Sequence, residues 1–367
     1  MIFCVIGAGN GGRAFAAYLA SKGHKVHLYN RSYSRIVDII RKGEIKSSGA
    51  LRGKFAIDLV TQNIKAALED ADVILVVTPA FAHKAIAKLI APYIAQDQII
   101  LLNPGRTFGS IEFRNTIKEQ IGNIPIFIGE TQTLIFTSRQ LKKNGVQVLK
   151  IKDSVDFCAF PEKHTFFIYD TLRETFPQLN PVEDYLEVSL KNIGMLLHPA
   201  LSLMNAGFMD IGKEFKFYKE GATFHACEVL EQIQFEINLL FEKLGIQRLS
   251  FCDWAEKSYG VNAKCIHDAI QNIIAYQDIN APKELITRYF TEDVPTGLVP
   301  ISSLAHFLGL KTPTIDSIIQ LSSILCGMEF KRIGRAINEL KFEDYITKRI
   351  NTQEFITDEK KSKKARI

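Results

Sequence analysis

Short apolar runs alternate with amphipathic segments along the first half of the chain. Five mainly apolar runs have the length of buried β-strands, at residues 2–6, 25–30, 73–77, 99–102 and 124–128. Segments with helical spacing lie between them, including residues 11–22, 32–42 and 80–94. Strands that alternate with helices form a parallel sheet, and continuous apolar strands are typical of a sheet covered on both faces. We therefore predict an α/β domain in this half.

The pattern changes near Phe176-Pro177. Before this point, residues 146–151 and 166–169 have the composition of further strands. Beyond it, the chain shows long segments with helical spacing, notably residues 182–203, 226–244 and 314–326. We therefore predict three parts, which are an α/β domain over residues 1–178, an all-helical domain over residues 179–357 and a flexible basic tail over residues 358–367.

A glycine-rich turn joins the first predicted strand to the first predicted helix. Gly7, Gly9 and Gly12 have the GxGxxG spacing, which allows a tight turn, close approach of the backbone to a pyrophosphate and close strand–helix packing. Asn10 and Gly11 lie where the turn meets the predicted helix, whose N-terminus offers N–H groups to phosphates. Because a strand precedes the motif and an amphipathic helix follows it, we predict a Rossmann-type NAD(P)-binding domain.

The second predicted strand ends at Asn30, Arg31 and Ser32. Sites specific for NAD usually have an acidic residue here, which holds the ribose 2′-hydroxyl. This sequence has no carboxylate at that place, and its amide, guanidinium and hydroxyl groups can all donate to a 2′-phosphate. We therefore predict that NADP is preferred to NAD. The alternative, in which Arg31 is an ordinary surface residue and either cofactor binds, stays open.

Two later strands end in further candidates for the cofactor site. Thr78 and Pro79 follow one strand, and Asn103, Pro104 and Gly105 follow the next. Ligands of open α/β sheets bind at the carboxyl ends of the parallel strands, so we expect these residues near the nicotinamide. Ordinary turn chemistry explains each of them equally well.

The predicted helical domain contains two places with candidate catalytic chemistry. His198 is a single ionisable residue in an apolar segment, where a histidine is more often part of the core than a catalyst. Arg288 and Asp293 lie beside a proline–glycine loop. A dehydrogenase of carboxylated substrates needs an acid/base, a group that holds its tautomer and a cation, which His198, Asp293 and Arg288 would supply. Separation along the chain says nothing about contact, so a structural salt bridge in the loop stays the alternative.

Composition narrows the class of protein further. The chain is 47% hydrophobic and 23% charged, like ordinary globular proteins, and no run approaches the roughly 18 apolar residues of a membrane span. Met1 leads directly into the first strand without a signal peptide, so we expect a cytoplasmic protein. Much of the net charge of +5 lies in the last ten residues, and we expect no nucleic-acid or membrane partner. The six cysteines have no CxxC spacing, and we expect no metal site.

These motifs together resemble the opine dehydrogenase family, of the octopine and nopaline dehydrogenase type, over nearly the whole chain. Residues 288–300, with the sequence RYFTEDVPTGLVP, carry the most specific similarity. The other similar stretches are the glycine turn and residues 104–107, 130–134, 192–199, 205–207, 217–221 and 275–276.

The resemblance implies an NAD(P)H-dependent enzyme that condenses an amino acid with an α-keto acid, such as pyruvate, and reduces the resulting imine. It also implies that His198 is the proton relay, that Asp293 is its partner and that Arg288 binds a carboxylate. The same resemblance assigns three further substrate-binding residues, which are Glu130, Thr133 and Asn192.

The sequence departs from the family at two places. Thr137 and Ser138 precede Arg139 where an aromatic residue is frequent, and Phe224 stands where a proline is common. Both departures bear on the substrate pocket, so neither the amino acid nor the keto acid is predicted.

Two other functions remain as alternatives. A ketopantoate reductase or a 2-hydroxy-acid dehydrogenase on the same two-domain plan would rely on a catalytic lysine, for which Lys191 is the candidate. A nucleotide-sensing protein without catalysis is the second alternative, and the presence of His198, Arg288 and Asp293 argues against it. The oligomeric state is not visible in the sequence, and a homodimer stays open.

Overall fold

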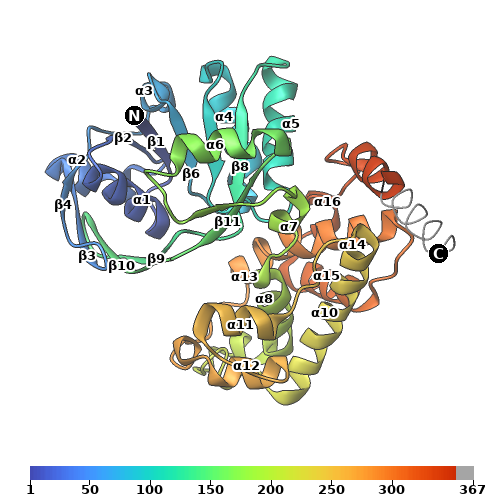
Figure 1. The fold of residues 1–367 in the computed structure, drawn as a ribbon. Coiled ribbons are helices and arrows are strands. Elements are labelled where there is room, and N and C mark those ends of the chain that lie inside the picture. The colour runs from blue at the N-terminus through green and yellow to red at the C-terminus, as the bar shows by residue number, and fades with distance from the viewer. Residues whose placement is uncertain (353–367) are drawn as a thin grey trace. The chain divides into compact units, whose positions relative to one another are not determined.

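The computed structural model describes residues 1–352 and divides the chain into two compact units (Figure 1). The first unit spans Met1–Leu190, and the second begins at Lys191. The predicted basic tail at residues 358–367 lies outside the described residues.

An eight-stranded sheet forms the centre of the first unit, in the order β12-β11-β8-β7-β6-β1-β2-β5. Its strands are β1 (Ile2–Ile6), β2 (Lys25–Tyr29), β5 (Leu59–Thr61), β6 (Val73–Val76), β7 (Ile99–Leu102), β8 (Phe127–Thr131), β11 (Val155–Ala159) and β12 (Leu179–Pro181). Neighbouring strands are parallel except β8 and β11. The strand order reverses beside β1, and ligands of such sheets bind at the carboxyl end of this point.

Helices cover both faces of this sheet (Figure 1). Successive residues of a strand point to opposite faces, so Phe3 belongs to one buried cluster and Cys4 to another. On one face lie α1 (Asn10–Ser21) and α6 (Thr165–Leu172), and on the other α3 (Ile64–Leu68), α4 (His83–Ile90) and α5 (Gly109–Ile121). The short helices α2 (Val37–Lys42) and α7 (Tyr185–Ser189) complete the unit. The predicted Rossmann-type domain is thereby confirmed.

A second sheet packs on the outer side of α1 and was not predicted as such. It has the order β4-β3-β10-β9, with β3 (Glu44–Gly49), β4 (Gly53–Ala56), β9 (Phe136–Gln140) and β10 (Gly145–Ile151). Phe15 of α1 meets Phe136 of β9 edge-on, with 4.7 Å between ring centroids. Helix α1 therefore lies buried between two sheets.

The strand predicted at residues 166–169 is wrong, because these residues belong to α6. Thr165, Ile168 and Leu172 are buried while Phe166 and Phe167 are exposed, which is helical spacing. Four apolar residues are too few to show whether burial repeats with the spacing of a strand or of a helix.

The first compact unit extends to Leu190, twelve residues beyond the predicted boundary at residue 178. β12 pairs with β11 at the edge of the sheet, and the Tyr185 hydroxyl of α7 donates to Glu130 of β8 at 3.1 Å. A strand of three residues that ends in proline gives no periodic signal.

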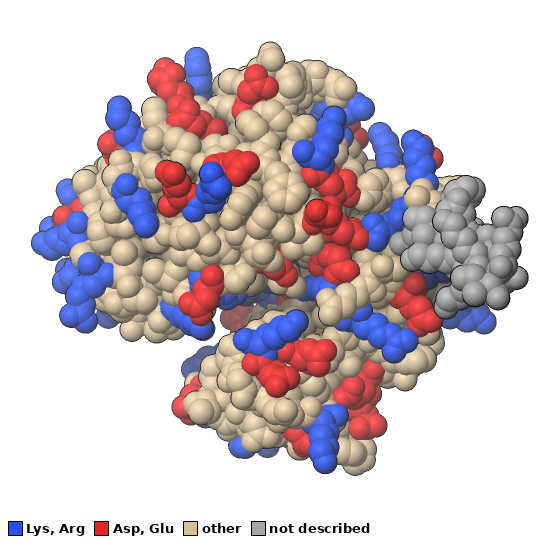
Figure 2. All heavy atoms as spheres, viewed as in Figure 1, with Lys and Arg blue, Asp and Glu red and all other residues tan. Residues whose placement is uncertain are grey.

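The second unit is helical, as predicted. Its helices are α8 (Ile193–Met204), α9 (Ala206–Asp210), α10 (Phe224–Leu244), α11 (Phe251–Tyr259), α12 (Ile266–Asn272), α13 (Arg288–Thr291), α14 (Val299–Phe307), α15 (Pro313–Cys326) and α16 (Phe330–Ile333), and residues 343–352 are helical too. In residues 191–352 the one strand-like pairing is a bridge between Lys216 and Asn280. None of the described helices is both long and apolar enough to cross a lipid bilayer. Figure 2 shows basic and acidic side chains interspersed over the visible face.

Candidate active site

Packing requires two of the three glycines of the GxGxxG spacing, Gly7 and Gly12, but not Gly9. Gly7 has a φ of 112°, and a Cβ there would lie 2.5 Å from the carbonyl oxygen of Val77. A Cβ on Gly12 would lie 1.6 Å from the carbonyl oxygen of Gly7. A Cβ added to Gly9 would have no atom of residues 1–352 within 4 Å. Gly7 and Gly12 thus shape the turn, and the open space at Gly9 fits the approach of a pyrophosphate.

The start of α1 suits an anion. The helix begins at Asn10 with no acidic residue in its first turn, so its positive dipole end is not neutralised there. The Asn10 side chain accepts a hydrogen bond from the Gln140 N–H at 2.8 Å, which ties the turn to β9. A Cβ on Gly11 would lie 2.9 Å from a methyl of Val77. Asn10 and Gly11 therefore contribute through their backbone.

The three residues after β2 divide into one internal and two exposed side chains. The side-chain Oδ1 of Asn30 accepts from the Ala8 N–H at 3.0 Å, and its side-chain Nδ2 donates to the Ser32 carbonyl at 3.0 Å. Asn30 therefore holds the loop together, which is an indirect role. Arg31 and Ser32 are exposed, and their side chains are accessible to a phosphate.

Residues after β6 and β7 border the same edge of the sheet. The buried Thr78 hydroxyl has no hydrogen-bond partner within residues 1–352. Thr78 lies beside the glycine turn, because a Cβ added to Gly7 would be 3.2 Å from the Thr78 methyl group. Such an orphaned polar atom beside the glycine turn fits a polar ligand there. Pro79 follows it directly and precedes a short helical turn.

The loop after β7 is held by β8. Asn103 is buried and its amide donates to the Leu101 carbonyl, while Gly105 N–H donates to the Thr131 carbonyl at 3.2 Å. A Cβ on Gly105 would lie 2.4 Å from the Glu130 carboxylate, so no larger residue fits. The Asn103–Pro104 peptide is cis.

Glu130 and Thr133 have different surroundings. The Glu130 carboxylate is 1% exposed and accepts from the Ser110 N–H at 2.6 Å and from the Tyr185 hydroxyl. This arrangement makes Glu130 a support for the start of α5. Thr133 Oγ1 accepts from the Lys152 ammonium at 2.9 Å.

Lys152 is a candidate that the sequence did not reveal. Burial lowers its pKa to about 8, helped by the positive charges of Arg106 and Lys150. Within residues 1–352 no carboxylate pairs with it, so its ammonium is available to an anionic ligand. Lys150 looks identical in sequence but is exposed and paired with Asp153 at 3.4 Å.

The second unit brings His198 and Asp293 together. His198 lies on α8, and its Nδ1 is 2.7 Å from Asp293 Oδ2, with side-chain exposures of 17% and 3%. A carboxylate at Nδ1 places the proton on that nitrogen, so Nε2 of the neutral ring accepts. Nε2 is 3.0 Å from the Tyr218 hydroxyl. Burial raises the pKa of Tyr218 well above its ordinary value, so the phenol stays protonated and donates to Nε2.

Close packing brings Asp293 to the histidine helix. Asp293 precedes a π-helical turn, Val294–Leu298, that packs on α8. A Cβ on Gly297 would lie 2.5 Å from that of Met195, which stands one turn before His198. A glycine at 297 therefore lets the two backbones approach.

Aromatic rings enclose the imidazole. Tyr289 stacks on His198 with 4.3 Å between centroids and 17° between planes, and Tyr276 stacks on Tyr218 at 4.1 Å. Tyr218 and Tyr289 come from segments far apart in the chain. The sequence placed both in family-like stretches, but nothing in it indicated that they contact His198.

The remaining predicted residues of the second unit differ in exposure and in partners. Arg288 is largely exposed, and its Nε lies 3.8 Å from the Glu292 carboxylate. Asn192 is buried and caps α8 by accepting from the Gly194 N–H at 3.1 Å. Lys191 precedes this cap and donates to Gln247 at 3.4 Å. Asn192 thus orients the helix that carries His198.

A glycine turn at the switch point of a doubly wound sheet and a buried His–Asp pair define a nicotinamide-dependent oxidoreductase. Two family models match the chain, one described as NAD/NADP octopine/nopaline dehydrogenase, alpha-helical domain, at residues 181–326, and the other as ketopantoate reductase PanE/ApbA, at residues 3–154. An opine dehydrogenase of Arthrobacter sp. (strain 1C) is 39% identical over 92% of this chain and 94% of its own length. The chain therefore belongs to the opine dehydrogenase family, as the sequence predicted.

Solved structures agree with the fold. An octopine dehydrogenase with NADH and L-arginine superposes with a TM-score of 0.79 at 18% identity, covering 94% of this chain and 96% of that one. A yersinopine dehydrogenase with NADP⁺ gives 0.72 at 13% identity, covering 96% and 98%. The protein is an NAD(P)H-dependent oxidoreductase of CH–NH bonds that reductively condenses an amino acid with a keto acid.

Proposed function

We propose that His198 is the acid/base of this condensation, that Asp293 holds its tautomer, and that NADPH is the preferred reductant. The observation that supports the roles of His198 and Asp293 is their buried pair, with 2.7 Å between Nδ1 and Oδ2. A buried carboxylate stabilises the imidazolium through a charge-assisted hydrogen bond. Nε2, which accepts from the Tyr218 hydroxyl in this structure, exchanges protons with substrate once substrate takes the place of that hydrogen bond.

Imine formation defines where His198 would act. The amine attacks the keto carbon, and His198 takes a proton from the attacking nitrogen and returns it to the carbonyl oxygen. A second proton, taken up from solvent, completes the leaving water as the nitrogen lone pair forms the C=N bond. The dinucleotide, when bound, supplies the hydride that reduces the C=N carbon. Water and a secondary amine dicarboxylate are the products.

Two cations are proposed to bind substrate carboxylates. Arg288 lies on the same short helix as Tyr289, which stacks on His198, and its guanidinium is largely exposed. Lys152 with Thr133 is the second, because a half-buried ammonium that has no carboxylate partner among residues 1–352 favours an anion. Asn192 and Glu130 act indirectly, because they accept hydrogen bonds from the first turns of α8 and α5 and so position these helices.

The preference for NADPH rests on the loop after β2. Arg31 and Ser32 are exposed there, and neither is a carboxylate that would repel a 2′-phosphate. The measurement is kcat/KM with NADPH against NADH, and a clear preference for NADH would exclude this part of the proposal.

A substrate screen tests the reaction and His198→Asn tests the mechanism. Amino acids are crossed with pyruvate, oxaloacetate and 2-oxoglutarate while NADPH oxidation is followed. We expect turnover only with both substrates, and a loss of about 10²–10⁴-fold in kcat/KM for His198→Asn. The matched control is His225→Asn, an exposed histidine on α10, which should leave the rate unchanged.

Two outcomes would contradict the proposal. Oxidation of NADPH by a keto acid without any amine would favour a ketopantoate reductase or a hydroxy-acid dehydrogenase. Full turnover by His198→Asn would remove the assigned acid/base.

A further inference from the structure

Arg13 is a buried arginine on the cofactor-binding helix. It lies on α1 directly after Gly12, and its side chain is 2% exposed. Within residues 1–352 it forms no ion pair with a carboxylate. Burial and the nearby charge of Arg35 lower its pKa, and Asp38 offsets this in part. Burying a charge without a paired counter-ion is costly, so its hydrogen bonds must compensate.

Four backbone carbonyls supply those hydrogen bonds. Nε donates to Ala8 at 3.2 Å, and Nη2 donates to Arg35 at 2.7 Å. Nη1 donates to Lys143 at 2.7 Å and to Gly145 at 3.1 Å. The guanidinium therefore joins the glycine turn, the short 3₁₀ turn Tyr33–Arg35 and the turn between β9 and β10.

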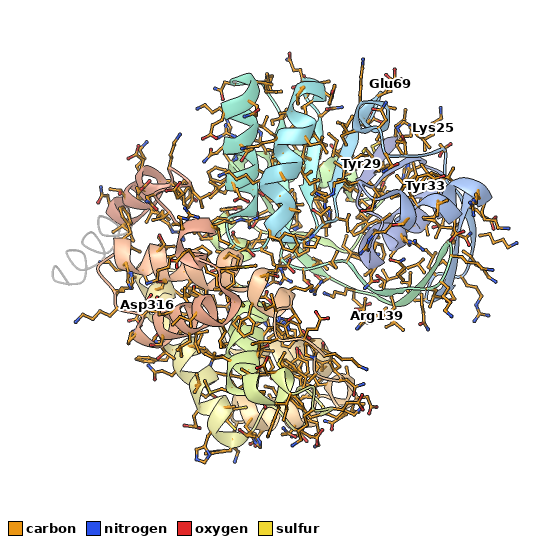
Figure 3. The ribbon with its side chains drawn as sticks, turned by 180° about the vertical axis from the view of Figure 1, so that it is seen from behind. Lys25, Tyr29, Tyr33, Glu69, Arg139 and Asp316 are labelled. Atoms are coloured by element: carbon orange, nitrogen blue, oxygen red, sulfur yellow. The ribbon has the colours of Figure 1, made fainter. Side chains whose placement is uncertain are left out.

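The glycine turn and the loop after β2 are thereby joined twice. Ala8 is held on both sides, because its N–H donates to the Asn30 side chain and its carbonyl accepts from the Arg13 guanidinium. Asn30 fixes the Ser32 carbonyl at one end of the loop, and Arg13 fixes that of Arg35 at the other. Figure 3 labels Tyr29 and Tyr33, which lie at the end of β2 and in the turn that follows.

We propose that Arg13 is a specificity-determining positioning residue for the dinucleotide. By holding Ala8 and Arg35 together, it sets the backbone of residues 31–35 relative to the glycine turn, so that the side chains of Arg31 and Ser32 meet a 2′-phosphate. This inference rests on the proposed use of NADPH. Lysine cannot replace Arg13. The planar guanidinium reaches four carbonyls in different directions, whereas a lysine ammonium has three donors at a single point.

The decisive measurement is KM for NADPH and for NADH in Arg13→Lys, which keeps the charge and loses the fork. We expect KM for NADPH to rise about tenfold, as when one charge-assisted contact is lost, and KM for NADH to change less than about threefold. The value of kcat at saturating NADPH should stay close to that of the wild type. The matched control is Tyr18→Phe, which removes a buried hydrogen bond from the same helix to Thr175 and should lower thermal stability without changing the ratio of the two KM values.

A double-mutant cycle with Arg31→Ala separates positioning from general destabilisation. If Arg13 acts through the loop, Arg31→Ala should raise KM for NADPH in the wild type and have little further effect in Arg13→Lys. Independent, multiplicative effects would overturn the proposal. An unchanged ratio in Arg13→Lys, or equal weakening of both cofactors, would also overturn it. If Arg13→Lys does not fold, Arg13→Gln takes its place in the same cycle.

Failure of the inference is distinct from failure of the proposed cofactor preference. A wild-type preference for NADH refutes the preference alone. The shift in the NADPH-to-NADH ratio between wild type and Arg13→Lys still decides the role of Arg13.

Discussion

The glycine turn of the first unit and the histidine cluster of the second are built in opposite ways. The turn needs residues that are neighbours in the chain, since Gly12 packs on the carbonyl of Gly7. The cluster needs Tyr218 and Asp293, which contact the imidazole ring of His198 from two other segments of the chain. A local motif is therefore visible in sequence, whereas a convergent one becomes visible only when the helices are packed.

The largest effect on stability is expected at the glycine turn, where it tests whether the turn depends on close packing. Gly12→Ala places a Cβ 1.6 Å from a backbone oxygen, and we expect a loss of about 3 kcal/mol in the free energy of unfolding. The Cβ of Gly9→Ala meets no atom of the described residues 1–352 within 4 Å. The free energy of unfolding should therefore change by less than about 1 kcal/mol, while KM for the dinucleotide rises at least about tenfold. Denaturant unfolding and KM together measure both. Equal stability of the two variants would contradict the assignment of roles.

A smaller effect, on KM for the keto acid, is expected at Lys152. This residue lies in the first unit, but its surroundings, like those of His198, come from separate segments of the chain. Its lowered pKa of about 8 means that the ammonium is present below pH 8 and is lost as the pH rises above it. We expect KM for the keto acid to increase above pH 8 in the wild type, and Lys152→Met to raise it about tenfold at pH 7 without that dependence.

Lys150→Met is the control for Lys152, because Lys150 is exposed and paired with Asp153. It should leave KM for the keto acid near the wild-type value. A rise in KM for NADPH instead of the keto acid would assign the Lys152 site to the cofactor.

The smallest effect is expected at Tyr218, which contacts His198 without a charge. Tyr218→Phe removes one neutral hydrogen bond to Nε2 and keeps the ring that stacks on Tyr276. We expect kcat/KM to fall about three- to tenfold, as for the loss of a single neutral hydrogen bond. Steady-state kinetics measures this, and a loss as large as that of His198→Asn would mean that Tyr218 itself transfers protons.

Much of the fold could be predicted because its signals are local. Strands β1, β6 and β7 are continuous apolar runs, and α10 and α15 show uninterrupted helical spacing. The second sheet could not be predicted in the same way, because its short strands are partly exposed and pair across large separations, as β3 does with β10. The end of the first unit at Leu190 was missed for the same reason.

By itself the sequence determined the dinucleotide turn, the two-domain class and, through its similarity to a family, the reaction. Those features depend on spacing within single segments. Only the tertiary structure decided that His198 Nδ1 faces Asp293, that Tyr218 donates to Nε2, that among residues 1–352 Lys150 has a carboxylate partner and Lys152 has none, and that Arg13 joins three loops. Each of these depends on burial and on contacts between distant segments, which fix the charge and direction of a side chain that the sequence merely names.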